Sequence, residues 1–283
     1  MQARVSLASD ASRRRPWQLE MFERSLKKRL KLAALLKQIG NVHGQACLLL
    51  TCGDNNGALN WHFRAHGGHW TWGDVAGENL EELSQLLDEP VHRIPEDRFP
   101  FADGQFDCVV SIDVLEHLAE DQRFLRELRR VLRPRGRAVV TVPNGDPRLL
   151  ANRIKWRVGM QPAVYGHTRA GYTLAELQDA VARAGLSPIG GGGYSRFFTE
   201  AVELLINFGY VFVLSRQREP IRPGSIAPTS STELQTHGAA YRLYRLAFPL
   251  LSLISRLDRL LPSRGNYAVI AVAVKPDVAG QAP

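Results

Sequence analysis

The chain has 283 residues, of which 45% are hydrophobic and 23% charged, and it carries a formal net charge of +8. This composition excludes a disordered or fibrous protein, and the length allows one large domain or one domain with an appendage. The three cysteines lie in apolar runs without the spacing of a zinc site, which predicts buried thiols in a reducing compartment. The first residues lack the apolar core of a signal peptide, so we expect a cytoplasmic protein.

The positive charge gathers in two regions. Residues 13 to 37 hold nine Lys/Arg against two Glu, and residues 216 to 264 are rich in arginine. A basic surface suits nucleic acid, acidic substrates or an anionic membrane, although solvated helix faces explain the same charge.

The beginning of the chain divides into a tail and a helix. Residues 1–15 are polar and rich in Ser and Arg, which predicts a disordered tail. Residues 16–40 have apolar side chains at helical spacing with basic residues between them, which predicts one amphipathic helix that ends at Gly40.

Residues 41–190 alternate between strand and helix patterns. The expected strands are 46–50, 69–74, 90–94, 106–113 and 133–144, and the expected helices are 58–65, 78–87, 122–132 and 174–186. Such alternation predicts a doubly wound, mostly parallel sheet with helices on both faces, a Rossmann-like α/β fold of three layers.

The remainder is less regular, and we expect a helical insertion over residues 191–262. It holds an apolar stretch at 197–215 that contains Glu200 and Glu203, so a buried or interfacial helix is expected and not a membrane span. A Pro/Ser/Thr-rich mobile loop is expected at 216–238 and an amphipathic helix at 239–261. A last core strand lies within 263–276, and residues 277–283 form a tail.

The segment 99–144 carries a specific combination of motifs. It has a Pro-Phe turn, FD at the start of a strand, LEH after that strand, ELRRVL in a helix, RP-x-G, and a strand that ends in VPN. In these features the chain resembles class I S-adenosylmethionine-dependent methyltransferases, and it is most similar to the group called methyltransferase type 11. The likeness extends with lower specificity over residues 47–186 and to the last strand, which it implies is antiparallel. It implies S-adenosylmethionine as cofactor.

The turn after the first strand reads CGDNNG and departs from the family pattern, which has an acid before the glycines. Leu50 or Thr51 stands at the place of that acid, so this contact is missing or replaced, while Gly53 and Gly57 remain. Asp54 and Asn55 tolerate left-handed backbone and offer polar side chains, so the resemblance implies a cofactor loop with a different lining. The alternative is a methyltransferase fold that has lost its cofactor and acts as a catalytically inactive binding module.

Three further positions match cofactor contacts of the family. Asp74 ends the second strand, where a carboxylate is expected to accept from both ribose hydroxyls, although it could instead cap the next helix. Glu96 or Asp97 follows the third strand, where the adenine amino group is expected. Asp113 lies where family members line the cofactor or substrate pocket.

The sequence SIDVLEH places Asp113, Glu116 and His117 at helical spacing i, i+3 and i+4. On a helix these side chains share a face and could bind a divalent cation, and some quinone-pathway O-methyltransferases have a similar E-x-x-E-H motif. The alternative, which leaves the protein without a metal, is a capping box with Asp113 as N-cap and Glu116 at the third position. His117 is then a candidate general base in the pocket.

The loop VYGHTRAGYT follows the fifth strand and is dense in polar and aromatic residues. His167 is a second candidate base, Arg169 could pair with an acidic group of the substrate, and Tyr165 and Tyr172 are candidate substrate contacts. An exposed turn whose tyrosines pack on the sheet is the alternative.

The resemblance therefore implies methyl transfer to an oxygen or nitrogen of a small-molecule, lipid-linked or sugar-linked acceptor. The apolar segment 197–215 and the helix 239–261 with its flanking arginines favour peripheral contact with the inner face of a membrane. The same helices could instead form a lid or a homodimer interface. No base-flipping or aromatic-basic motif is found, so nucleic acid is not expected as a partner.

Overall fold

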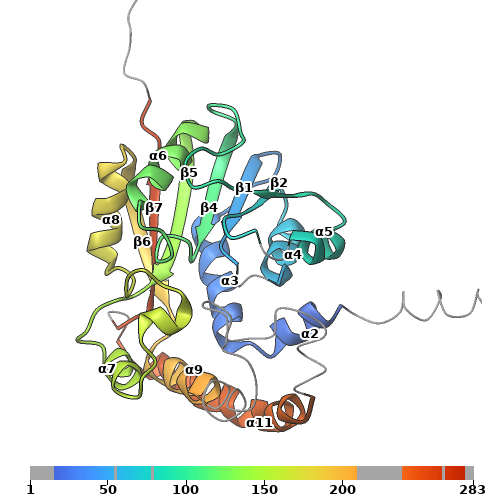
Figure 1. Ribbon diagram of the computed structural model, residues 1–283, viewed down its shortest axis with the longest axis vertical. Helices are drawn as coiled ribbons and strands as arrows, with labels where there is room; N and C mark the ends of the chain where they lie inside the picture. The colour runs from blue at the N-terminus through green and yellow to red at the C-terminus, as the bar shows by residue number, and fades with distance from the viewer. Residues whose placement is uncertain (1–15, 54–55, 78–79, 209–237, 263–264, 278–283) are drawn as a thin grey trace, which may run out of the picture.

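A computed structural model describes residues 16–53, 56–77, 80–208, 238–262 and 265–277 (Figure 1). The tail predicted for residues 1–15, nearly all of the loop predicted for 216–238, and the end of the chain lie outside the described residues.

The centre of the fold is a seven-stranded sheet with the order β3-β2-β1-β4-β5-β7-β6. Strands β1 to β5 are parallel, whereas β7 runs antiparallel to both β5 and β6. The predicted doubly wound α/β sheet with an antiparallel last strand is therefore confirmed. The strands are β1 (Ala46–Thr51), β2 (His69–Asp74), β3 (Val91–Arg93), β4 (Phe106–Ile112), β5 (Leu132–Pro143), β6 (Ser187–Tyr194) and β7 (Ala268–Val274).

Helices cover both faces of this sheet. One core packs side chains of α6 (Asp121–Val131) and α8 (Leu174–Arg183) against the strands. The other packs side chains of α2 (Trp17–Glu23), α3 (Leu26–Ile39) and α4 (Ala58–Ala65) against the opposite face, next to α5 (Leu80–Leu87). The continuous apolar runs of β1, β4 and β5 follow from this, because strands covered on both sides are buried on both sides.

The N-terminal region forms two helices and not the single one predicted. The chain breaks at Arg24 and Ser25, and the Ser25 hydroxyl accepts a hydrogen bond from the backbone N–H of Lys28, which caps α3. A serine side chain at this position satisfies an N–H that an uninterrupted helix would bond internally, so it favours a new start.

A third group of helices lies beyond the carboxyl ends of the strands, at the lower end of the molecule in Figure 1. It consists of α7 (Leu150–Arg157), the short 3₁₀ helix η1 (Pro162–Tyr165), α9 (Phe197–Phe208), α11 (Gly238–Arg256) and the 3₁₀ turn η4 (Leu257–Leu260). No helix in the described part of the chain is long and apolar enough to cross a membrane.

The glycine run at 190–193 forms part of β6, the edge strand beside β7. The boundary predicted between residues 190 and 191 is therefore wrong, and the helical part begins at Phe197. Close backbone approach explains two glycines of the run: an added Cβ would lie 2.5 Å from the carbonyl oxygen of Ile270 at Gly191, and 2.4 Å from that of Ala268 at Gly193. A Cβ at Gly190 would meet nothing within 4 Å.

This difference within one strand gives a matched test. We expect Gly193→Ala to lower the free energy of unfolding by about 2 kcal/mol, since an added methyl must displace backbone. Gly190→Ala should leave it unchanged or raise it slightly, because alanine restricts the unfolded chain. Urea unfolding of both variants checks this, and equal losses would contradict the close approach at Gly193.

Candidate active site

The turn after β1 is held to the end of β2 by Asp74. Its carboxylate, 2% exposed, accepts from the Thr51 hydroxyl at 2.7 Å, from the Gly53 N–H at 3.2 Å and from the Gly77 N–H at 2.9 Å. The bond to Gly77 stays within the loop and does not reach α5, which begins at Leu80. Asp74 therefore shapes the loops at the carboxyl ends of β1 and β2, where ligands bind in doubly wound sheets.

The two glycines of this turn meet a geometric requirement. Gly53 has φ +62° and Gly57 φ +83°, a left-handed conformation that favours glycine. A Cβ at Gly53 would lie 3.0 Å from the Ala76 Cβ, so the turn also packs closely on the loop after β2. Asp54 and Asn55 lie outside the described residues.

Glu96 and Asp97 lie in the loop after β3, and both are exposed. They stand beyond the carboxyl end of their strand, as expected of adenine contacts. That role stays a prediction.

Asp113 directly follows β4 and turns the chain. It has φ +49°, a rare conformation for a residue other than glycine, and such backbone is often found at functional sites. Its Oδ2 forms an ion pair with Lys31 of α3. Its Oδ1 is buried and has no hydrogen-bond partner among the residues that the structure describes, so an acceptor is available for a cationic group.

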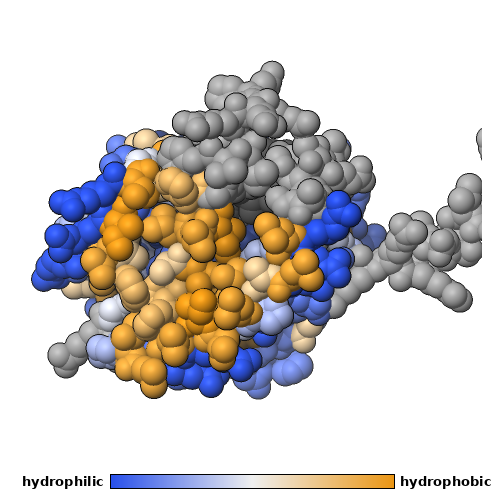
Figure 2. All heavy atoms as spheres, turned by 90° about the horizontal axis from the view of Figure 1, so that it is seen from below, coloured by the Kyte–Doolittle hydropathy of each residue, from blue (hydrophilic) through white to orange (hydrophobic). Residues whose placement is uncertain are grey.

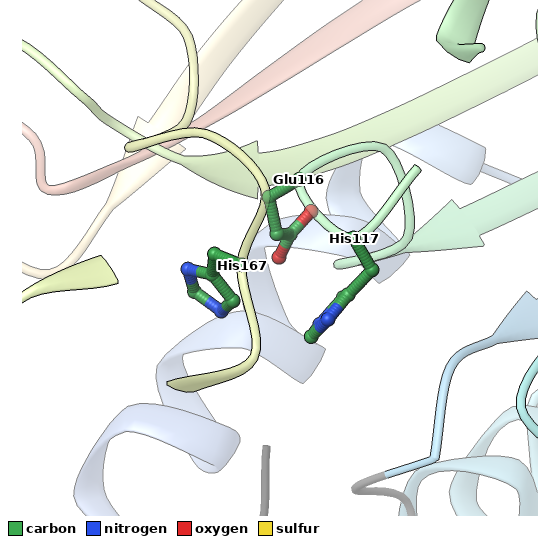
Figure 3. A group of neighbouring side chains, drawn as sticks. All are labelled: Glu116, His117 and His167. Atoms are coloured by element: carbon green, nitrogen blue, oxygen red, sulfur yellow. The ribbon is translucent and has the colours of Figure 1, made fainter. Parts of the chain in front are cut away.

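The segment after Asp113 is a turn, and α6 begins only at Asp121. The helical face and the capping box predicted for Asp113, Glu116 and His117 are therefore both wrong. The left-handed residue at 113 explains this, because a single αL residue ends regular structure. The turn instead directs Glu116 and His117 toward His167, which comes from the loop after η1 (Figure 3).

The two histidines lie in edge-to-face contact, with ring centroids 4.8 Å apart. His117 Nδ1 lies 3.1 Å from the carbonyl oxygen of Gly166, and because a carbonyl only accepts, Nδ1 carries the proton. In the neutral ring Nε2 then holds the lone pair. Burial, together with the nearby His117, lowers the pKa of His167 to about 4, so His167 is neutral at physiological pH.

Glu116, His117 and His167 also bring potential metal-ligand atoms within 4.8 Å of one another. One carboxylate and two imidazoles are a donor set that could hold a divalent cation. This set differs from the one considered from sequence, because Asp113 pairs with Lys31 and His167 takes its place.

The loop 164–173 is divided between two roles. Tyr165 and His167 line a cavity, and burial raises the pKa of Tyr165 to about 12. Arg169 and Tyr172 do not line it: the Arg169 guanidinium donates to Asp121 at 2.8 Å and to Tyr172 at 2.6 Å, and the Tyr172 hydroxyl donates to Asp121 at 2.5 Å. The structure therefore places these two residues at the start of α6, where they hold the loop to the body of the protein.

The acceptor cavity, as we call it here, has a volume of about 280 Å³ and lies at the carboxyl ends of β4 and β5. Its walls come from α3, the turn after β4, η1 and the two helices α7 and α9. Its polar lining comprises Ser25, Lys27, Lys28, Lys31, Asp113, Glu116, His117, Asn144, Asn152, Lys155, Tyr165, His167, Glu203, Asn207 and Tyr267.

A buried ion network supports one side of the cavity. The side chain of Glu200 on α9 is fully buried and accepts from Lys155 of α7 at 2.5 Å, from Lys27 of α3 at 2.7 Å and from the Ser195 hydroxyl at 2.7 Å. Burial by itself would raise the pKa of Glu200, but the two ammonium groups outweigh it and lower the pKa to about 2. This network was not predicted from the sequence. The only local signal for it is an acid within an apolar helix, which requires a buried partner.

Comparison with known proteins points to a methyltransferase domain. Residues 48–140 match the family model described as a methyltransferase domain. An O-methyltransferase of ubiquinone biosynthesis from Cereibacter sphaeroides is 28% identical over 154 residues, which is 51% of this chain and 62% of that protein. The chain thus spans less than two thirds of this curated relative.

Solved structures share the fold over most of the chain. The complex of a Haloferax volcanii methyltransferase with a methyltransferase activator matches with a TM-score of 0.55 and 15% identity, covering 93% of this chain and 95% of the other. A phosphoethanolamine N-methyltransferase of Haemonchus contortus in complex with S-adenosylmethionine matches with a TM-score of 0.51 and 15% identity, covering 88% of this chain and 53% of the other.

Residues 48–140 thus match a methyltransferase domain, and the fold is the one found in class I S-adenosylmethionine-dependent methyltransferases. The cofactor of such a domain is S-adenosylmethionine. At the sheet edge, the buried Oδ1 of Asp113 has no partner among the described residues and suits the ammonium group of this cofactor, whereas the Asp74 carboxylate already accepts from Thr51, Gly53 and Gly77.

The network around Glu200 predicts a large effect on stability. Glu200→Gln removes the carboxylate that pairs directly with Lys27 and Lys155 and leaves them only the charge of the neighbouring Glu203, so the free energy of unfolding should fall by about 3 kcal/mol at neutral pH. Because the folded-state pKa of Glu200 is depressed, its contribution is present above the ordinary value of 4.5 and is lost as the pH falls toward about 2.

Urea unfolding of the wild type and Glu200→Gln at several pH values measures this. The difference between them should be constant from neutral pH down to about 5 and shrink below that. Glu81→Gln, at an exposed site on α5, should change the unfolding free energy by less than about 0.5 kcal/mol. A Glu200→Gln loss no larger than this control would contradict the network.

Proposed function

We propose that the chain transfers the methyl group of S-adenosylmethionine to an oxygen or nitrogen atom of a small-molecule or lipid-linked acceptor held in the acceptor cavity. The observation that carries the proposal is Asp113, which belongs to the cofactor edge of the sheet and also lines the cavity with His117 and His167. The name of the Cereibacter relative favours a hydroxyl oxygen as acceptor.

When bound, the cofactor supplies a sulfonium methyl group with a good leaving group, so the protein mainly aligns the reactants. Asp74 accepts from the ribose hydroxyls and Asp113 Oδ1 accepts from the ammonium group. Thr51, Gly53 and Gly57 shape the loop beside them, and Glu96 or Asp97 accepts from the adenine amino group. These roles rest on the position of each residue at the carboxyl end of its strand.

His117 is the proposed general base. Since its Nδ1–H is bound to Gly166, Nε2 is the atom that takes the proton of an acceptor hydroxyl. His167 stays neutral beside it, because burial disfavours its charged form. Because the His167 ring is neutral, no second positive charge stands next to His117 when His117 accepts the proton of the acceptor.

Cofactor binding tests the first half of the proposal. We expect S-adenosylhomocysteine to bind the wild type with micromolar affinity in titration calorimetry. Asp74→Asn should weaken binding about tenfold or more, since it removes the negative charge that strengthens a hydrogen bond to each hydroxyl. Asp179→Asn, at an exposed position on α8, is the matched control. A folded wild type that binds no S-adenosylhomocysteine would favour the inactive binding module.

The proposed role of His117 as general base predicts a loss of kcat. His117→Gln should lower kcat for methyl transfer from labelled S-adenosylmethionine to hydroxylated aromatic test acceptors by roughly a hundredfold, as expected when a general base is removed. The affinity for S-adenosylhomocysteine should not change. His69→Gln, an exposed position at the opposite end of the sheet, is the control. If both variants keep the wild-type kcat, His117 is not the base.

A further inference from the structure

The lower end of the molecule presents an exposed apolar face. Figure 2 shows hydrophobic side chains gathered over the end of the molecule where α7, α9 and α11 lie in Figure 1. Leu246 and Leu260 are each 81% exposed, and Leu205 of α9 is 66% exposed. A large exposed apolar patch bordered by polar residues usually marks an interaction site.

The leucines of α11 and η4 repeat with a regular spacing. Exposed leucines occur at alternating intervals of three and four residues, which places them along one side of the helix. They are Leu243, Leu246, Leu250, Leu253, Leu257 and Leu260. The helix is fixed to α9 by other groups, among them the Ser255 hydroxyl, which lies 2.6 Å from the Thr199 hydroxyl. The leucine side is therefore not needed to attach α11 to α9.

The charges beside these leucines are of one sign. Arg242, Arg245, Arg256 and Arg259 are all exposed. The one acid between residues 242 and 262 is Asp258, which is buried and accepts from the backbone N–H groups of Arg196 at 2.9 Å and Phe198 at 2.8 Å. Asp258 thus caps α9 and does not offset the arginines at the surface.

The exposed leucines and the arginines beside them distinguish between two possible binding partners, a second copy of the chain and a lipid surface. A second copy packed against it would bring two arginine borders together, and like charges across an interface oppose association. An anionic lipid surface offers hydrocarbon to the leucines and negative headgroups to the arginines. Since no described helix is long and apolar enough to cross a membrane, the fitting geometry is a helix lying in the plane of the surface.

We propose that this docking face, formed by the exposed apolar residues of α7, α9, α11 and η4 with the four arginines beside them, binds an anionic lipid surface. Lys155 of α7 and Asn207 of α9 line the acceptor cavity, so docking places one wall of that cavity next to the lipid. Delivery of a lipid-borne acceptor to the cavity rests on the proposed function, whereas docking itself does not.

Co-sedimentation with vesicles tests the docking face. The probe is vesicles of phosphatidylcholine mixed with phosphatidylglycerol, compared with phosphatidylcholine alone, at physiological salt. The wild type should bind the mixed vesicles. The double variant Leu246→Ser/Leu260→Ser should need more than tenfold more lipid for half-maximal binding, because two exposed leucines no longer enter the lipid. Ile189→Ser, on β6 and 55% exposed, should bind as the wild type does.

The arginines give an independent readout. Arg242→Gln, Arg245→Gln and Arg256→Gln should each weaken binding to the mixed vesicles roughly fivefold, while Arg183→Gln on α8 should not.

Three outcomes would overturn the proposal. The wild type could fail to sediment with the mixed vesicles. The leucine double variant could bind as well as Ile189→Ser. The wild type could be a dimer that the leucine substitutions dissociate, without vesicle binding. S-adenosylhomocysteine affinity, measured in solution on the same samples, separates failure of docking from failure of the proposed function.

Discussion

The acceptor cavity depends on one buried carboxylate. Glu200 lies on α9, which follows β6, and it binds Lys27 of α3 and Lys155 of α7, the helix after β5. The helices α3, α7 and α9, which are separate in sequence, are thus joined through the carboxylate of Glu200, which has no contact with solvent. A buried carboxylate is costly unless it is paired, and the pairing requires α3, α7 and α9 to stand in this arrangement around the cavity.

The chemistry is concentrated where this arrangement meets the carboxyl edge of the sheet. Parallel strands end at the same edge, so Thr51, Asp74 and Asp113 are brought together by topology alone. The left-handed residue Asp113 comes just before Glu116 and His117, which line the cavity, and its buried Oδ1 has no hydrogen-bond partner among the described residues. In the proposed function Asp113 therefore stands between the cofactor and the acceptor, which an in-line transfer must hold in alignment.

The sheet could be predicted from the sequence because its strands are short apolar runs separated by amphipathic helices. The methyltransferase motifs between Phe99 and Asn144 added the family. The segment D-x-x-E-H was wrongly predicted to be a helix, because its spacing fits a helix as well as a turn. No residue type in the segment indicates that Asp113 has a left-handed backbone conformation. The inward-facing lysines of α3 could not be distinguished from solvated ones, since the acid that binds Lys27 lies more than 170 residues later in the chain. Residues that belong to a short sequence motif could be predicted from the sequence. Residues whose role depends on a partner far away in the chain could not.

The most direct test of the account is a crystal structure of the protein with S-adenosylhomocysteine. We expect density for the ligand across the carboxyl ends of β1, β2 and β4, with its ribose hydroxyls on Asp74 and its amino group on Asp113 Oδ1. His117 and His167 should then face the sulfur across the acceptor cavity. Ligand density at another place, or a crystal saturated with S-adenosylhomocysteine in which this edge of the sheet stays free of it, would contradict the assignment of the cofactor site.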